Sequence, residues 1–123
     1  MTAPQSKPKV LVVDDERVIA DTLSIILGQA GFDASAVYSG PAAVEKAESF
    51  RPYLVISDVI MGDMNGIEAA IQIRRILPGC KILLFSGQAA TADLLETARA
   101  QGHEFEILAK PVHPQDLLAK LKG

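Results

Sequence analysis

The strongest constraint on the fold is the alternation of short apolar runs with longer segments of helical periodicity. The apolar runs are only a few residues long and mostly rich in Val, Ile or Leu, which favours buried strands. The predicted strands cover residues 9–13, 34–38, 53–57, 80–85 and 104–109. The run at 34–38 is weaker than its neighbours, so we expect this strand at an edge of the sheet.

Helical patterns follow each of these runs. In the first helix, apolar residues recur at helical spacing at Ile19, Leu23, Ile26, Leu27 and Ala30. Gly31 follows as a stop signal. The second predicted helix opens at Ser39-Gly40-Pro41 and ends before Pro52. The remaining predicted helices cover residues 66–77, 91–100 and 114–121.

The order of these elements fixes the fold class. Strand and helix alternate five times with short connections, which predicts an α/β fold with a five-stranded parallel sheet. Right-handed crossovers place helices on both faces, so the sheet is doubly wound. The length of 123 residues corresponds to one domain. We expect a flexible N-terminal tail at residues 1–8 and a single domain at residues 9–123.

Composition excludes several classes of protein. The formal net charge is −3 and no run of Lys or Arg occurs, which argues against direct binding to nucleic acid. The single cysteine, Cys80, rules out an internal disulfide, fits a reducing compartment such as the cytoplasm, and is expected to be buried. The apolar runs are far too short to span a membrane, and the N-terminal residues lack the apolar core of a signal peptide.

Polar residues stand where four of the predicted strands end. Asp14 and Asp15 follow the first strand, Asp58 the third, Ser86 the fourth and Lys110 the fifth. The carboxyl ends of parallel strands share one edge of the sheet, and open α/β sheets bind their ligands there. We therefore expect three acids, one hydroxyl and one ammonium group to converge at this edge.

These residue types suit phosphoryl chemistry. Carboxylates about 4 Å apart repel each other by several kcal/mol, so they recruit a cation, and an all-oxygen ligand set suits Mg²⁺. Asp58 beside such an ion can act as a nucleophile toward phosphorus, while Lys110 and Ser86 donate hydrogen bonds to phosphoryl oxygens. Taken alone, Asp14 or Asp15 also fits a helix N-cap, and each of the others a turn or loop. Their joint occurrence at four strand ends favours a site.

Several short motifs are typical of one family. They are Val13-Asp14-Asp15-Glu16, Asp58 with Met61-Gly62-Asp63-Met64-Asn65-Gly66, Ser86, and Lys110-Pro111. With these motifs the chain resembles a response-regulator receiver domain of two-component signalling over essentially residues 10–121. The resemblance implies the flavodoxin-like (β/α)5 receiver fold.

The resemblance also implies how metal and phosphate would be held. Asp58 would be the phosphoacceptor, and Asp15 would be a direct ligand of Mg²⁺. Asp14 would hold the ion through water, and the backbone carbonyl of Ile60 would complete the protein ligands. The implied donor is a phosphohistidine on a sensor histidine kinase or a phosphotransfer protein.

The phosphorylation switch matches the family pattern only in part. Lys110 would pair with the phosphoryl group, and Ser86 would be the hydroxyl that shifts to meet it. Gly62 stands where the family usually has Pro. Ile107 occupies the position where an aromatic switch residue is expected, and Phe105 lies two residues earlier on the same side of the strand.

Three functions fit these observations. The first is a stand-alone phosphoacceptor that contacts a downstream protein target and catalyses only its own phosphorylation and dephosphorylation, so it is not counted as an enzyme. The second is a Mg²⁺-dependent phosphohydrolase with an aspartyl nucleophile, which would normally carry a second acid two residues later, where this chain has Ile60. The third is a binding module that is not phosphorylated, which the complete set of acids disfavours.

Overall fold

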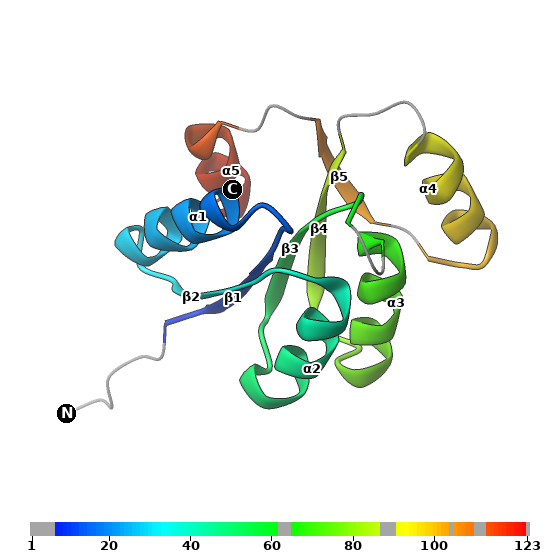
Figure 1. The fold of residues 1–123 in the computed structure, drawn as a ribbon, viewed down its shortest axis with the longest axis horizontal. Coiled ribbons are helices and arrows are strands. Elements are labelled where there is room, and N and C mark those ends of the chain that lie inside the picture. Colours follow the sequence, from blue (N-terminus) through cyan, green and yellow to red (C-terminus); the bar gives the residue numbers. More distant parts are fainter. Residues whose placement is uncertain (1–6, 62–64, 87–90, 104, 110–112, 123) are drawn as a thin grey trace.

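The computed structural model describes residues 7–61, 65–86, 91–103, 105–109 and 113–122. Strands and helices alternate along the chain (Figure 1). The strands are β1 (Lys9–Val13), β2 (Asp33–Val37), β3 (Leu54–Asp58), β4 (Lys81–Ser86) and β5 (Glu106–Ala109). The helices are α1 (Arg17–Gln29), α2 (Gly40–Phe50), α3 (Gly66–Ile76), α4 (Thr91–Ala100) and α5 (Pro114–Lys122).

The strands form one parallel sheet in the order β2-β1-β3-β4-β5. β2 lies at an edge, as predicted from its weak apolar pattern. Helices α1 and α5 cover one face of the sheet, and α2, α3 and α4 lie on the other (Figure 1). The predicted doubly wound α/β fold with a five-stranded parallel sheet is therefore confirmed.

Alternate residues of the strands feed two separate cores. On β1, Val10 and Val12 belong to the core beneath α1 and α5, which also contains Leu117. Leu11 and Val13 belong to the core beneath α2, α3 and α4. This alternation follows from the period of two residues along a strand. Because both faces of β1 are covered, the strand reads as an uninterrupted apolar run.

The structure differs from the sequence analysis in two details. β5 begins at Glu106, two residues later than predicted, while Glu104 lies outside the described residues. Ile19, one of the apolar residues that recur at helical spacing, is 37% exposed and so lies outside the buried face of the helix. The helix begins at Arg17, and its buried face is formed by Ala20, Leu23 and Leu27.

The remaining general predictions concern the termini, the cysteine and the membrane. The proposed tail falls mainly on residues 1–6, outside the described part, and Lys7 and Pro8 are exposed before β1. Cys80 is buried as predicted, and burial raises the pKa of its thiol to about 11. Among the residues that the structure describes, no helix has the length and apolar character that a membrane span requires.

Candidate functional site

Asp58 is the last residue of β3 and lies in a nearly buried position, with 8% of its surface exposed. The backbone N–H of Ile60 donates a hydrogen bond to Asp58 Oδ1 at 3.3 Å. The chain stays tied to the sheet for one more residue, because the N–H of Val59 donates to the carbonyl of Phe85 in β4. These bonds fix the direction in which the carboxylate leaves the strand.

Asp14 and Asp15 follow β1, the neighbour of β3 in the sheet. The N–H of Asp14 donates to the carbonyl of Val37 at 3.2 Å, which holds this residue against the end of β2. Asp14 Oδ1 accepts a hydrogen bond from the N–H of Glu16 at 2.9 Å. The N-cap of α1 is Glu16, so the alternative interpretation of Asp14 or Asp15 as the helix N-cap is not what the structure shows.

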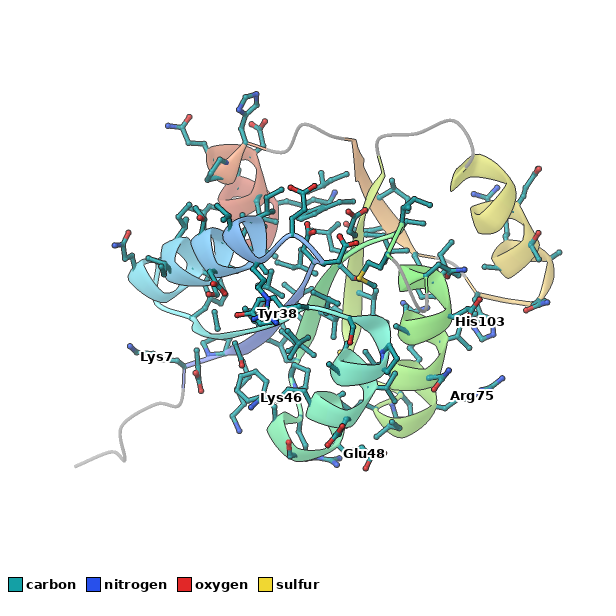
Figure 2. The ribbon with its side chains drawn as sticks, viewed as in Figure 1. Lys7, Tyr38, Lys46, Glu48, Arg75 and His103 are labelled. Carbon is teal, nitrogen blue, oxygen red and sulfur yellow. The ribbon has the colours of Figure 1, made fainter. Side chains whose placement is uncertain are left out.

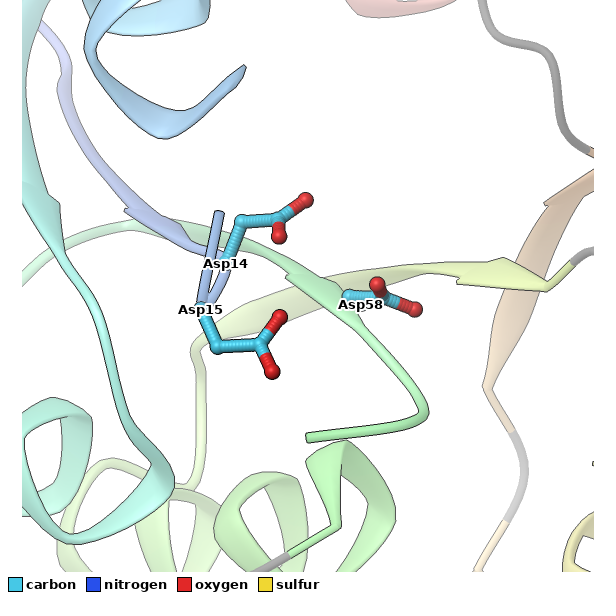
Figure 3. Close-up of side chains that lie close together, drawn as sticks. All are labelled: Asp14, Asp15 and Asp58. Carbon is cyan, nitrogen blue, oxygen red and sulfur yellow. The ribbon is translucent and has the colours of Figure 1, made fainter. Parts of the chain in front are cut away.

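The three acids converge as predicted (Figure 3). One carboxylate oxygen from each of Asp14, Asp15 and Asp58 lies within 4.8 Å of the other two. Asp14 and Asp58 are buried and Asp15 is exposed, so the cluster opens to solvent on one side. An all-oxygen set with few protein donors and open access to water fits Mg²⁺, which keeps several of its waters.

Gly66, the first residue of α3, lies in close contact with the end of β3. A Cβ at this position would overlap the backbone carbonyl oxygen of Asp58, so no larger residue fits without movement. The N–H of Gly66 also donates to the carbonyl of Val59 at 2.7 Å. The hydroxyl of Ser57 donates to the carbonyl of Asp58 at 2.9 Å from within the same buried contact. This packing fixes the backbone that carries the central carboxylate.

The start of α3 is fixed by a reciprocal cap. Asn65 Oδ1 accepts from the N–H of Glu68 at 2.8 Å, and Asn65 Nδ2 donates to Glu68 Oε1 at 3.1 Å. The spacing of these two residues resembles a capping box, which is visible in the sequence. The roles of Ser57 and of the Gly66 contact were missed in the sequence analysis, because they depend on how α3 packs against β3.

The other two predicted site residues are described only in part. Ser86 ends β4 and stands opposite Ala109 of β5, so the backbone reaches the predicted edge of the sheet. Its side chain lies outside the described residues. Lys110 follows Ala109 directly and also lies outside them. Their roles toward a phosphoryl group therefore remain predictions, as does metal binding by the carbonyl of Ile60.

The residues of the predicted switch face the core beneath α2, α3 and α4. Ile107 in β5 and Phe105, which precedes β5, both pack against this core, although Phe105 is not part of the strand as the sequence analysis expected. The guanidinium of Arg74 lies 4.6 Å from the centre of the Phe105 ring. The ring of His103 is stacked with the ring of Phe105, with 6.5 Å between the two centroids.

A polar network joins α1 to the end of β2 beside the acids. The hydroxyl of Tyr38 donates to Asp21 Oδ1 at 2.6 Å, and the guanidinium of Arg17 lies 4.2 Å from the centre of the Tyr38 ring. The hydrogen bond with Asp21 raises the pKa of Tyr38. Because Tyr38 follows Val37, whose carbonyl binds Asp14, this network lies next to the acidic cluster.

The profile of the response regulator receiver domain matches residues 10–122. The chain belongs to the response regulator receiver domain family. This membership confirms the resemblance stated from the sequence motifs.

The chain is similar to a chemotaxis protein and to a longer transcriptional regulatory protein. The chemotaxis protein CheY of Thermotoga maritima is 33% identical over 114 residues, which are 92% of this chain and 93% of that protein. The probable transcriptional regulatory protein TcrX of Mycobacterium tuberculosis is 31% identical over 93% of this chain but only 48% of its own length. The chain thus spans nearly all of one relative and about half of the other.

A solved structure confirms the fold of the receiver domain. The CheY-like response regulator receiver domain protein of Methanospirillum hungatei superposes with a TM-score of 0.84 at 27% identity. The match covers 95% of this chain and 92% of the other. The parallel sheet with helices on both faces is therefore a receiver fold.

Proposed function

We propose that this receiver domain accepts a phosphoryl group on Asp58 from a phosphohistidine and signals through protein contacts. The observation that carries the proposal is the cluster of Asp14, Asp15 and Asp58 at adjacent strand ends, with oxygens within 4.8 Å of one another. Membership in the receiver family supports the same chemistry. The chain would act on itself rather than on an external substrate, so we do not class it as an enzyme.

In the proposed reaction, a carboxylate oxygen of Asp58 attacks phosphorus while the bond from phosphorus to the donor imidazole nitrogen breaks. The electron pair of the broken bond stays with the imidazole. Asp15 would bind Mg²⁺ directly, Asp14 through water, and Ile60 through its backbone carbonyl. When bound, the ion supplies positive charge to the phosphoryl oxygens. Lys110 would stabilise the same oxygens as an ion-pair partner.

Ser86 would respond to the product of this reaction. Its hydroxyl would move toward the phosphoryl group and pull on the chain that follows β4. A couple of charge-assisted hydrogen bonds, worth about 1.5–3 kcal/mol each, are enough to shift a two-state surface substantially. Because Ile107 replaces the expected aromatic, we propose that the response is led by Ser86 and not by an aromatic rotamer change.

The surface around the acids suits docking of a protein donor. Ile60, two residues past Asp58, is 40% exposed, and Val18, three residues past Asp15, is 78% exposed. Ile25, two turns further along α1, is 60% exposed. Large apolar side chains at such exposure indicate a contact surface when they border a site. We propose that a sensor histidine kinase or a phosphotransfer protein covers them during transfer.

The output is proposed to be a protein target in the cytoplasm. TcrX is described as a probable transcriptional regulator, and the chain spans about half of its length. The present chain has a net charge of −3 and no basic run, so we propose no direct contact with nucleic acid. A buried, unpaired thiol at Cys80 fits the reducing conditions of the cytoplasm.

Intact mass after incubation with acetyl phosphate and Mg²⁺ tests the proposal. We expect one added phosphoryl group, which requires Mg²⁺ and is lost in Asp58→Asn. Continuous release of phosphate with no stable adduct would favour the phosphohydrolase instead. No adduct and no turnover would favour the binding module. Retention of a full equivalent of acid-stable, base-labile phosphate on Asp58→Asn would place the acceptor elsewhere.

A further inference from the structure

Arg17 brings a positive charge close to the acidic cluster. It is the first residue of α1 and stands two residues past Asp15. Two residues of chain span at most about 7 Å, so an extended arginine side chain at this position can reach the Asp15 carboxylate. Both residues are exposed, which leaves room for such a contact. A guanidinium that paired with Asp15 would compete with Mg²⁺ for the same oxygens.

In the structure, Arg17 is directed toward Tyr38 instead. Its guanidinium carbon lies 4.2 Å from the centre of the Tyr38 ring, inside the range of about 6 Å for a cation–π contact. The Tyr38 hydroxyl donates to Asp21 Oδ1 at 2.6 Å, which fixes the orientation of the ring. Asp21 stands four residues past Arg17 on α1, so its negative charge lies on the same side of the helix as the guanidinium.

The position of Tyr38 does not depend on Arg17 alone. Tyr38 is half-buried and packs against the core beneath α1 and α5. It directly follows Val37, whose carbonyl accepts a hydrogen bond from the N–H of Asp14. Figure 2 labels Tyr38 where the chain leaves β2 near α1. The ring is therefore a fixed contact surface for the guanidinium, next to the strand end that carries the acids.

We propose that Tyr38 and Asp21 hold Arg17 away from Asp15 and thereby keep the acidic cluster open to Mg²⁺. The inference rests on the proposed magnesium site and adds a control of its affinity. Tyr38 and Asp21 are positioning residues, because they act on the metal only through Arg17. Without the ring, the guanidinium would pair with Asp15, and the metal would have to displace it.

Titration with Mg²⁺ at constant ionic strength, followed by amide NMR, gives the dissociation constant for each variant. Tyr38→Leu should weaken Mg²⁺ binding about three- to fivefold, which is the competition that an exposed ion pair between Arg17 and Asp15 can supply. Tyr38→Phe keeps the ring but loses the bond to Asp21, so it should weaken binding by only about twofold. Arg17→Gln should change the affinity by less than about twofold, because salt screens an exposed charge.

The double variant Tyr38→Leu/Arg17→Gln separates competition by Arg17 from structural damage at the end of β2. Because the competing cation is gone, it should bind Mg²⁺ within about twofold of Arg17→Gln alone. Every other charge of the chain is the same in these variants, so the comparison reports on Arg17. A loss of affinity that persists in the double variant would mean that Tyr38 only supports the local fold, and would overturn the proposal.

Phe50→Leu is the matched control for loss of an aromatic ring beside cations. Lys9 Nζ and Lys46 Nζ lie 5.6 and 5.5 Å from the Phe50 ring, and Lys46 is labelled in Figure 2. Phe50 ends α2 near the start of β1, away from the acids, so this variant should bind Mg²⁺ like the wild type. Thermal unfolding should confirm that each variant is folded.

The wild type distinguishes failure of this proposal from failure of the magnesium site. A wild type that binds Mg²⁺ at Asp15, beside a Tyr38→Leu variant of equal affinity, would overturn the role of Arg17 and leave the magnesium site intact. A wild type whose amide shifts show no Mg²⁺ binding near Asp15 would overturn both.

Discussion

Asp58→Asn should stabilise the folded chain in the absence of Mg²⁺, because it removes one of three clustered negative charges. Two unit charges at 4.8 Å interact by about 3.5 kcal/mol at an effective dielectric constant near 20 and by about 1 kcal/mol in water. The repulsion between Asp58 and buried Asp14 should be near the first value, and the repulsion between Asp58 and exposed Asp15 near the second. Asparagine keeps the oxygen that accepts from the N–H of Ile60.

The net gain should be smaller than the sum of these repulsions. Salt screens the exposed pair, and an ammonium group such as that of Lys110 would already offset part of the charge. We therefore expect an increase of about 1–2 kcal/mol in the free energy of unfolding. At a urea dependence of about 1–3 kcal/mol per molar, the unfolding midpoint should rise by roughly 0.3–2 M.

Urea unfolding followed by circular dichroism, with and without Mg²⁺, measures this effect. Bound Mg²⁺ stabilises the wild type by about 2.7 kcal/mol at one hundred times its dissociation constant, so the advantage of the variant should vanish or reverse there. Asp33→Asn is the control, because Asp33 is an exposed acid at the opposite end of β2. A less stable Asp58→Asn without Mg²⁺, beside an unchanged Asp33→Asn, would refute the account of clustered repulsion.

Four further predictions follow from the site and its surroundings. Gly66→Ala should lower the free energy of unfolding by at least about 1–3 kcal/mol, because the new Cβ would overlap the Asp58 carbonyl oxygen. Gly28 has open space around it, so Gly28→Ala should leave the free energy of unfolding unchanged or raise it in the same denaturation assay. Ile60→Asn should speed loss of phosphate from Asp58 about tenfold, or 1.4 kcal/mol of barrier, by orienting water; an unchanged phosphate half-life would exclude water access there as limiting. Val18→Asp should slow phosphorylation by a histidine kinase and leave the rate with acetyl phosphate unchanged, and equal slowing of both would contradict a docking role. Raising the pH from 9 to 11 should lower the free energy of unfolding of the wild type, relative to that of Cys80→Ala, by roughly 2 kcal/mol. Burial raises the pKa of the Cys80 thiol to about 11, so the thiol of the unfolded chain ionises first. A difference between the two proteins that stays constant across this pH range would contradict this prediction.

The sequence was sufficient for the parts of the molecule that depend on local pattern. Apolar runs and helical spacing located the strands and helices, and the rule that parallel strands share a carboxyl edge brought Asp14, Asp15 and Asp58 together. The exposure of Ile19 was not predicted, because helical spacing defines an apolar stripe but not its rotation against the sheet. The late start of β5 at Glu106 depends on pairing with β4, which no local pattern encodes.

The Gly66 contact also depends on tertiary packing that no local pattern encodes. The sequence shows a glycine after an asparagine, and that pair also fits an ordinary loop. Only the packing of α3 on β3 reveals that a side chain at Gly66 would displace the backbone of Asp58.

The placement of the tyrosines makes the chain suited to two-site spectroscopy. The sequence contains two tyrosines and no tryptophan. Tyr38 lies after β2 beside the acidic cluster and donates a hydrogen bond to Asp21, whereas Tyr53 lies directly before β3 at the other edge of the sheet. Incorporation of fluorotyrosine would therefore give two resonances, one for each end of the sheet. A single labelled sample could then report phosphorylation at one end of the sheet and would reveal whether the other end senses it.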